Sequence, residues 1–208
     1  MAEKLPNKKI VVVLPAYHAV KTLKQTFDNI PNEWVDDIIL VDDASNDDTA
    51  KLSRSLGIKT FVHPANRGYG GNQKTCYREA LALRADIVVM VHPDFQYDPK
   101  FIPEILKPIA SGRCDAVFGS RMLTKGTARA GGMPLWKYLA NIALTTIGNL
   151  ILGYNLSEYH SGFRAYSREA LEHLALELNS NNFVFDTEII AQLKSCKLKI
   201  GEIPITTR

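Results

Sequence analysis

Residues 10–14 read Ile-Val-Val-Val-Leu, and Pro15 follows them. An unbroken run of aliphatic, mostly β-branched residues is typical of a strand buried on both faces, the kind found in parallel sheets. Apolar residues then recur at helical spacing, at positions 20, 23, 27 and 30. The chain is therefore predicted to open with a buried strand followed by a helix.

Strands and helices continue to alternate along the chain. Further strands are predicted at 37–42 (DIILVD), 58–63, 86–92, 115–120, 163–166 and 199–206. Helices are predicted after the polar turn 43–48, at 75–85, 98–109 and 134–152, and twice between 166 and 199, while 66–71 is predicted to be a glycine-bearing loop. This alternation indicates an α/β fold with a mainly parallel central sheet flanked by helices. No shift in composition divides residues 1–208, which we expect to form a single domain.

The composition is that of an ordinary globular protein. The 208 residues are 46% hydrophobic, and 25 Lys and Arg against 22 Asp and Glu leave a net charge of +3. So small a net charge argues against a nucleic-acid-binding protein, and the apolar fraction argues against disorder. The amino terminus lacks the apolar segment of a signal peptide, and the three cysteines are odd in number and widely spaced. Both features favour the cytoplasm, a reducing compartment.

Polar residues gather where the predicted strands end. Tyr17 and His18 follow the first strand, Asp42 and Asp43 lie at the end of the second, and the loop 66–71 follows the third. In open α/β sheets, ligands bind at the carboxyl ends of the strands. The pattern predicts a site for a ribose, base, phosphate or metal at this edge, although residues 42–48 could instead be only a turn and a helix cap.

His92, Asp94 and Gln96 alternate after the fourth predicted strand. In an extended chain alternate side chains point to the same side, so all three could face one site. A carboxylate and a carboxamide oxygen suit a hard divalent cation that also holds phosphate oxygens. In the alternative interpretation the segment is a turn in which Asp94 caps a neighbour and His92 packs.

The sequence contains neither the GxGxxG motif of dinucleotide-binding dehydrogenases nor the GxxxxGK[ST] of a P-loop. Instead, the chain resembles family 2 glycosyltransferases with the GT-A fold, and most closely the dolichol-phosphate mannose synthase type, which transfers sugars to polyprenyl phosphates. Seven motifs in the family's order carry this resemblance and cover nearly the whole chain: VVVLPAY (11–17), VDDASNDDT (41–49), NRGYGG (66–71), HPDFQYDP (92–99), GSR (119–121), SGFRAYSREAL (161–171) and EIPI (202–205).

The resemblance implies a donor site for a nucleoside-diphosphate sugar. Asp43 would hydrogen-bond the base, and Asp94 and Gln96 would ligate a divalent metal, Mg²⁺ or Mn²⁺, that bridges the diphosphate. Arg208 matches an arginine that closes over the diphosphate. The residues that the resemblance places around the donor are Pro15, Ala16, Tyr17, Asp43, Gly71, His92, Asp94 and Arg208.

The resemblance also implies an acceptor site. Arg121, Lys137 and Asn141 would hold the acceptor phosphate, and Asp94, Arg121 and Lys137 are the expected catalytic residues. Direct displacement would invert the anomeric configuration. A phosphate is already anionic at neutral pH and needs orientation more than deprotonation, so no general base is required. Glu158 could act as a base if the acceptor were instead a hydroxyl.

Two positions depart from the family's pattern. His18-Ala19-Val20 follows Tyr17 where the family has an acidic pair, and His92 replaces the first Asp of Asp-x-Asp. Imidazole suits softer cations than Mg²⁺, so His92 could favour Mn²⁺. It could equally serve as a hydrogen-bond donor to the nucleotide, and both UDP and GDP remain open as the donor's nucleotide.

The segment 134–152 is uncharged except near its start, where Trp136 and Lys137 lie beside a broadly apolar helix. Aromatic and basic residues beside apolar ones are typical of a helix at a membrane interface, and the alternative is an ordinary buried helix. We expect an inverting, metal-dependent glycosyltransferase that uses polyprenyl phosphate at the cytoplasmic face of a membrane. Two other hypotheses are a soluble family 2 enzyme acting on a saccharide or protein hydroxyl, and a non-catalytic sugar-nucleotide-binding protein.

Overall fold

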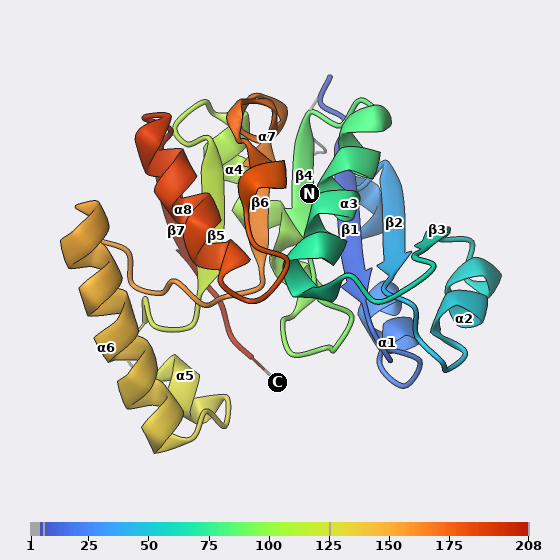
Figure 1. Ribbon diagram of the computed structural model, residues 1–208, viewed down its shortest axis with the longest axis horizontal. Helices are drawn as coiled ribbons and strands as arrows, with labels where there is room; N and C mark the ends of the chain where they lie inside the picture. Colours follow the sequence, from blue (N-terminus) through green and yellow to red (C-terminus); the bar gives the residue numbers. More distant parts are fainter. Residues whose placement is uncertain (1–4, 6, 125, 208) are drawn as a thin grey trace.

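A computed structural model describes residues 5, 7–124 and 126–207. The described chain forms one seven-stranded sheet in the order β3-β2-β1-β4-β6-β5-β7 (Figure 1). The pairs β1–β2, β1–β4, β2–β3 and β5–β7 are parallel, and β6 runs antiparallel to both of its neighbours. The prediction of a mainly parallel sheet is confirmed. The strands are β1 (Ile10–Ala16), β2 (Asp37–Asp42), β3 (Lys59–Val62), β4 (Ile87–Met90), β5 (Ala116–Ser120), β6 (Arg164–Ser167) and β7 (Ile200–Pro204).

Helices cover both faces of the sheet, with α3 and α8 on one side and α1 and α4 on the other (Figure 1). Short 3₁₀ turns at Asn32–Trp34, Pro99–Phe101 and Leu176–Leu178 connect some of the elements. The α-helices are α1 (Leu23–Asp28), α2 (Thr49–Ser55), α3 (Gly68–Ala82), α4 (Ile102–Ala110), α5 (Thr127–Ala130), α6 (Leu135–Leu152), α7 (Arg168–His173) and α8 (Phe185–Ser195).

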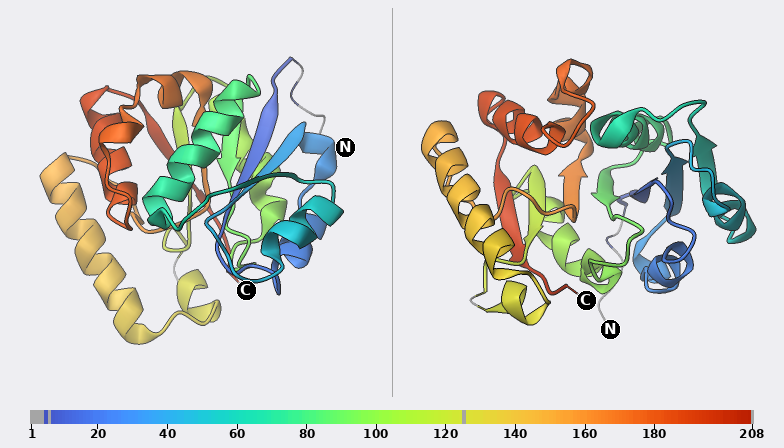
Figure 2. Two further views of the ribbon diagram at one scale, coloured as in Figure 1. Left: turned by 45° about the vertical axis from the view of Figure 1, so that its right-hand side comes forward. Right: turned by 60° about the horizontal axis from the view of Figure 1, so that its bottom comes forward.

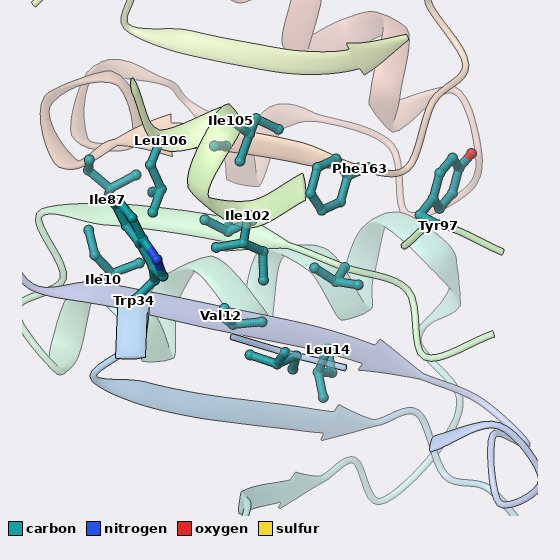
Figure 3. Close-up of a cluster of buried hydrophobic side chains, with 14 of the residues drawn as sticks. Ile10, Val12, Leu14, Trp34, Ile87, Tyr97, Ile102, Ile105, Leu106 and Phe163 are labelled. Carbon is teal, nitrogen blue, oxygen red and sulfur yellow. The ribbon is translucent and has the colours of Figure 1, made fainter. Parts of the chain in front are cut away.

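Strand β1, which lies between β2 and β4, is buried along its whole length, as its β-branched run predicts. Alternate residues enter opposite layers: Val12 packs under α4 together with Ile102, while Val13 packs under α3 together with Tyr77. Figure 3 shows the first of these layers, in which Val12 and Ile102 lie among other aliphatic and aromatic side chains. Two apolar layers therefore hold β1 in place, and with it the carboxyl end at which the site lies.

The strand order reverses direction beside β1. After β1 the chain adds β2 and β3 on one side, and then crosses to place β4 on the other. Ala16 is paired with Asp42, so the carboxyl ends of β1 and β2 lie level. A crevice at such a switch point is where open α/β sheets bind ligands.

Helix α3 begins at Gly68, seven residues before the predicted start, so the expectation of a loop over 66–71 is wrong for residues 68–71. The first turn of α3 packs against the chain that leads into α8. A Cβ at Gly70 would lie 2.4 Å from the carbonyl oxygen of Ser180. The glycines therefore allow α3 to pack closely against this segment. Glycines are equally typical of a loop, so the sequence alone does not tell the two cases apart.

Helix α6 lies at the edge of the molecule beyond β7, as both views of Figure 2 show. Its buried residues are the polar Asn141 and Thr145, whereas most of its apolar side chains are exposed, and Leu152 at its end packs partly against the core. Leu150 is 85% exposed and Ile151 is 73% exposed. The alternative of an ordinary buried helix is therefore wrong. In the described part of the chain, none of the helices has the length and hydropathy needed to cross a bilayer.

Candidate donor and acceptor sites

A cavity of about 510 Å³ opens at the carboxyl ends of β1, β2 and β4. Six residues predicted to bind the donor meet in its wall: Pro15, Ala16, Tyr17, Asp43, His92 and Asp94. The other lining residues are His18, Ala19, Thr22, Asn66, Gly68, Tyr69, Asn72, Pro93 and Phe183. The structure thus brings segments from positions 15 to 183 together around one cavity.

Asp43 is 3% exposed and fixes the loop between β3 and α3. Its Oδ1 accepts hydrogen bonds from the backbone N–H of Arg67 (2.8 Å) and from Nδ1 of His63 (2.7 Å). Its Oδ2 accepts from the N–H of Gly68 (3.0 Å). Asp43 is therefore more than a turn residue, because it joins the end of β2 to the first turn of α3 at the cavity wall.

The segment 92–96 is a turn, so the expectation of an extended chain is wrong. Phe95 has a φ of +58°, a conformation that side chains other than glycine rarely adopt, and Oδ1 of Asp94 accepts the N–H of Gln96 at 2.9 Å. Asp94 is exposed and lines the cavity, whereas Gln96 is not among the lining residues. A strained backbone beside an exposed carboxylate is typical of a functional site.

The ring of His92 packs between Tyr69 and Gly162. It is stacked on Tyr69 at a centroid separation of 5.4 Å, with Nε2 3.4 Å from the Tyr69 hydroxyl. A Cβ at Gly162 would lie 2.5 Å from Cδ2 of His92, so only glycine leaves room for the ring. Burial lowers the pKa of His92, although Asp94 and Asp186 favour its charged form. The imidazole is therefore neutral at pH 7.

A chain of polar contacts continues from Tyr69 into the core. The Tyr69 hydroxyl donates to Oδ2 of Asp186 at 2.8 Å, and Asp186 pairs with the fully buried Arg164 at 3.4 Å. Burial, together with the Asp186 carboxylate, raises the pKa of Tyr69 well above its ordinary range. Tyr69 is thus a neutral donor that ties the cavity wall to α8.

Of the two aspartates in the cavity wall, Asp43 is buried and hydrogen-bonded to the backbone, and Asp94 is the exposed one. Within the described ranges, no group of three or more His, Cys, Asp and Glu side chains is arranged to hold a metal. Mg²⁺ commonly uses one or two carboxylates and takes its remaining ligands from water and substrate phosphates. Asp94 fits this pattern, because it is exposed at the cavity and His92 lies beside it in the same wall.

The predicted acceptor residues Arg121 and Asn141 meet at a buried carboxylate, that of Glu158. The Nε of Arg121 donates to Oε1 of Glu158 at 2.9 Å, and Nη2 contacts the same oxygen. Nδ2 of Asn141 donates to that oxygen from α6 at 2.9 Å. Burial alone would lower the pKa of Arg121, but the hydrogen bond with Glu158 outweighs it and raises that pKa. Lys137, by contrast, is exposed on α6.

Glu202 of the EIPI motif supports this cluster from β7. Its carboxylate accepts hydrogen bonds from the N–H of Ser157 at 2.9 Å and from the Ser157 hydroxyl at 2.7 Å. The N–H of Glu158 also donates to it, at 3.3 Å. The motif near the carboxyl end therefore positions Glu158, and through it Arg121.

Two predicted donor residues lie elsewhere. Gly71 is buried in α3 against Arg67 and Asn181 and does not line the cavity, and Arg208 lies outside the described residues. Sequence reasoning missed Tyr69 and Phe183. Tyr69 stood inside the quoted NRGYGG motif, whereas Phe183 reaches the cavity only because its loop packs on α3, and no local signal marks that contact.

Comparison with known proteins gives a consistent result. A model of the family described as Glycosyl transferase family 2 matches residues 11–175. A UDP-N-acetylglucosamine–dolichyl-phosphate N-acetylglucosaminyltransferase of Methanococcus voltae is 34% identical over 220 residues, which span 98% of this chain and 87% of the relative. An undecaprenyl-phosphate mannosyltransferase of Micrococcus luteus is 26% identical over 208 residues, or 95% of this chain and 83% of the relative.

Among solved structures, glucosyl-3-phosphoglycerate synthase from Mycobacterium tuberculosis in complex with Mn²⁺, UDP and glucosyl-3-phosphoglycerate has a TM-score of 0.71 to this chain. The two are 21% identical, and the match covers 97% of this chain and 72% of that one. The predicted GT-A fold is confirmed by this likeness and by the sheet order.

Proposed function

Because this chain belongs to glycosyl transferase family 2, we propose that it transfers a sugar, with inversion, from a nucleoside-diphosphate sugar to a polyprenyl phosphate. The proposal rests above all on one observation: Glu158, the acid that the predicted acceptor residues Arg121 and Asn141 contact, is 1% exposed and is engaged by both. A carboxylate held in this way is poorly placed to deprotonate a hydroxyl acceptor. An acceptor phosphate needs no such base.

On the donor side, Asp43 would bind the base and Tyr17 would border it. Asp94 would hold a divalent ion, Mg²⁺ or Mn²⁺, which when bound neutralises the charge of the departing diphosphate. Gln96 remains a predicted further ligand, and the turn at Phe95 presents the Asp94 carboxylate to the cavity. The neutral His92 ring forms the wall beside that carboxylate.

On the acceptor side, Arg121 would orient the phosphate. Its Nε and Nη2 are engaged by Glu158, which leaves Nη1 without a hydrogen bond in the described part of the chain. The guanidinium lies against the ring of Tyr97, 5.6 Å from its centroid, so its plane is fixed. Lys137 would add a mobile positive charge from the exposed start of α6.

Helix α6 supports a lipid acceptor. Its outward face carries Leu139, Ile147 and Leu150, each more than half exposed, and Trp136 is 72% exposed at its start. A helix with this pattern partitions into the headgroup region, so we place the enzyme at the cytoplasmic surface of a membrane. The two relatives named above carry dolichyl phosphate and undecaprenyl phosphate in their names, which is consistent with such an acceptor.

The deciding experiment is a transfer assay with radiolabelled UDP- and GDP-sugars and a short polyprenyl phosphate, in the presence of Mg²⁺ or Mn²⁺. We expect label to enter the lipid fraction, and EDTA to abolish the transfer. Matched reactions contain a polyprenol without phosphate, or saccharide and peptide acceptors. Transfer to these hydroxyl acceptors alone would support a soluble glycosyltransferase, and nucleotide binding without any transfer would support a non-catalytic binding protein.

A further inference from the structure

Most of the hydrogen-bond acceptor positions on the Asp43 carboxylate are already occupied. A carboxylate offers about four acceptor positions, two on each oxygen. Both positions on Oδ1 are taken, by Nδ1 of His63 and the N–H of Arg67, and one position on Oδ2 is taken by the N–H of Gly68. Asp43 lines the cavity and is 3% exposed, and the one acceptor position that its carboxylate keeps is on Oδ2.

The three donors to Asp43 are held in place independently of it. His63 is 7% exposed, and its Nε2 lies 2.9 Å from the hydroxyl of Thr75. Arg67 and Gly68 begin α3, whose first turn is fastened by the N–H of Gly70 donating to the carbonyl of Asn181 at 2.8 Å. A ligand cannot readily displace donors that are anchored in this way.

We propose that this arrangement selects uracil, so that the donor of the proposed transfer is a UDP-sugar, and that His63 is the residue responsible. Uracil presents one imide N–H, which needs one acceptor. Guanine presents two neighbouring donors, N1–H and N2–H, which pair best with both oxygens of a carboxylate. Against Asp43 one of these donors would be desolvated without a partner, which is costly in a buried wall.

His63 is a specificity-determining residue because it occupies the second acceptor position on Oδ1. An ionised carboxylate only accepts, so Nδ1 of His63 must carry the proton in this contact. Replacing His63 with leucine removes that donor and leaves an acceptor position open on the oxygen that guanine would need. The inference rests on the proposed donor site, but it is separable from the transfer reaction.

The test is calorimetric titration of the full chain with UDP, GDP and CDP in the presence of MnCl₂. We expect UDP to bind at least about tenfold more tightly than GDP, the effect of one unsatisfied donor. CDP should also bind weakly, because cytosine places a lone pair at N3 where uracil has its N–H. Equal or tighter binding of GDP would overturn the inference while leaving the proposed transfer intact, whereas binding of none of the three would overturn the proposed function itself.

Two variants separate the role of His63 from general damage to the fold. His63→Leu should reduce the ratio of UDP to GDP affinity severalfold, toward unity. Thr75→Val is the matched control: it removes the partner that anchors Nε2 but keeps the contact from Nδ1 to Asp43, so it should lower the ratio less than His63→Leu does. An unchanged ratio of UDP to GDP affinity in a folded His63→Leu protein would contradict the role of His63 in base selection. If that variant fails to fold, the wild-type ratio still decides the choice of base.

Discussion

Asp94 projects its charge into the cavity from a tight turn, and one of its oxygens is committed to the N–H of Gln96. The remaining oxygen is available to a cation. Four residues on, Asp98 makes the same kind of contact, accepting the N–H of Lys100 at 3.1 Å, but it does not line the cavity. Asp98 caps the 3₁₀ turn Pro99–Phe101 with this contact, so it serves as a control aspartate that makes a similar backbone hydrogen bond away from the cavity.

Asp94→Asn keeps an oxygen for the Gln96 N–H and removes the charge. We expect transfer to fall about 100-fold or more, because a metal bound at this carboxylate supplies several kcal/mol of charge stabilisation. The affinity for Mn²⁺ in the presence of nucleotide should fall with it, while the melting temperature of the metal-free protein should stay unchanged. Asp98→Asn should retain activity, and a similar loss in both variants would contradict the role of Asp94.

The buried imidazole of His92 should make the free energy of unfolding fall as the pH is lowered. Burial depresses its pKa below the ordinary value of about 6.5, so the unfolded chain binds more protons than the folded one as pH falls. The stability from the neutral imidazole is full above pH 6.5 and is lost as pH falls through the depressed pKa. Between pH 7 and pH 5 the free energy of unfolding should decline more steeply for the wild type than for His92→Asn. Parallel urea-denaturation curves across this range would contradict the assignment.

At the scale of elements, the pair of Arg121 and Glu158 joins the end of β5 to the segment that precedes β6. Both side chains are at least 96% buried, and α6 is fastened to the same carboxylate through Asn141. Three elements therefore depend on one ion pair. The residue expected to orient the acceptor is also a structural link.

Arg121→Ala should lower the free energy of unfolding by about 3–5 kcal/mol, because it leaves a buried carboxylate without its cation. The comparison variant is Lys107→Ala, which breaks an exposed pair with Glu104 on α4 and should change stability by less than about 1 kcal/mol. Urea denaturation measures both values. If the two substitutions cost the same, the Arg121 pair is not the link that its burial implies.

At the scale of the whole molecule, helix α6 lies at the edge of the protein beyond β7 (Figure 2), and most of its apolar side chains are exposed. Only Asn141 and Thr145 of this helix are buried, and Leu152 at its end is partly buried against the core. An apolar face turned to solvent is explained if the membrane covers it during the reaction.

The double variant Leu150→Glu/Ile151→Glu should weaken sedimentation with anionic phospholipid vesicles at least about tenfold, because two charges replace residues of the inserting face. Its melting temperature should match that of the wild type. The control is Leu178→Glu, at a residue that is also 85% exposed but lies in the turn between α7 and α8. Loss of vesicle binding in the control alone, or in neither protein, would contradict membrane docking through α6.

Most of the sheet, and the chemistry at its edge, could be predicted from the amino-acid sequence. Strand β2 spans residues 37–42, as predicted, and Tyr17, Asp43 and Asp94 meet at one cavity as expected. These features can be predicted from local sequence. A run of β-branched residues identifies a buried strand without reference to the rest of the chain. The carboxyl ends of parallel strands lie at one edge of the sheet, so the residues that follow them lie close together.

The contacts of each side chain could not be predicted in this way, because they depend on segments that are far apart in the sequence. The glycines at 68–71 became a helix start because another chain segment lies against them, and α6 turned its polar residues inward because Glu158 offered Asn141 a partner. Likewise, the donors around Asp43 come from residues 20 to 25 positions away. A sequence pattern gives the spacing of residue types along the chain. The hydrogen bonds that a buried polar side chain makes depend on residues that only folding brings close to it.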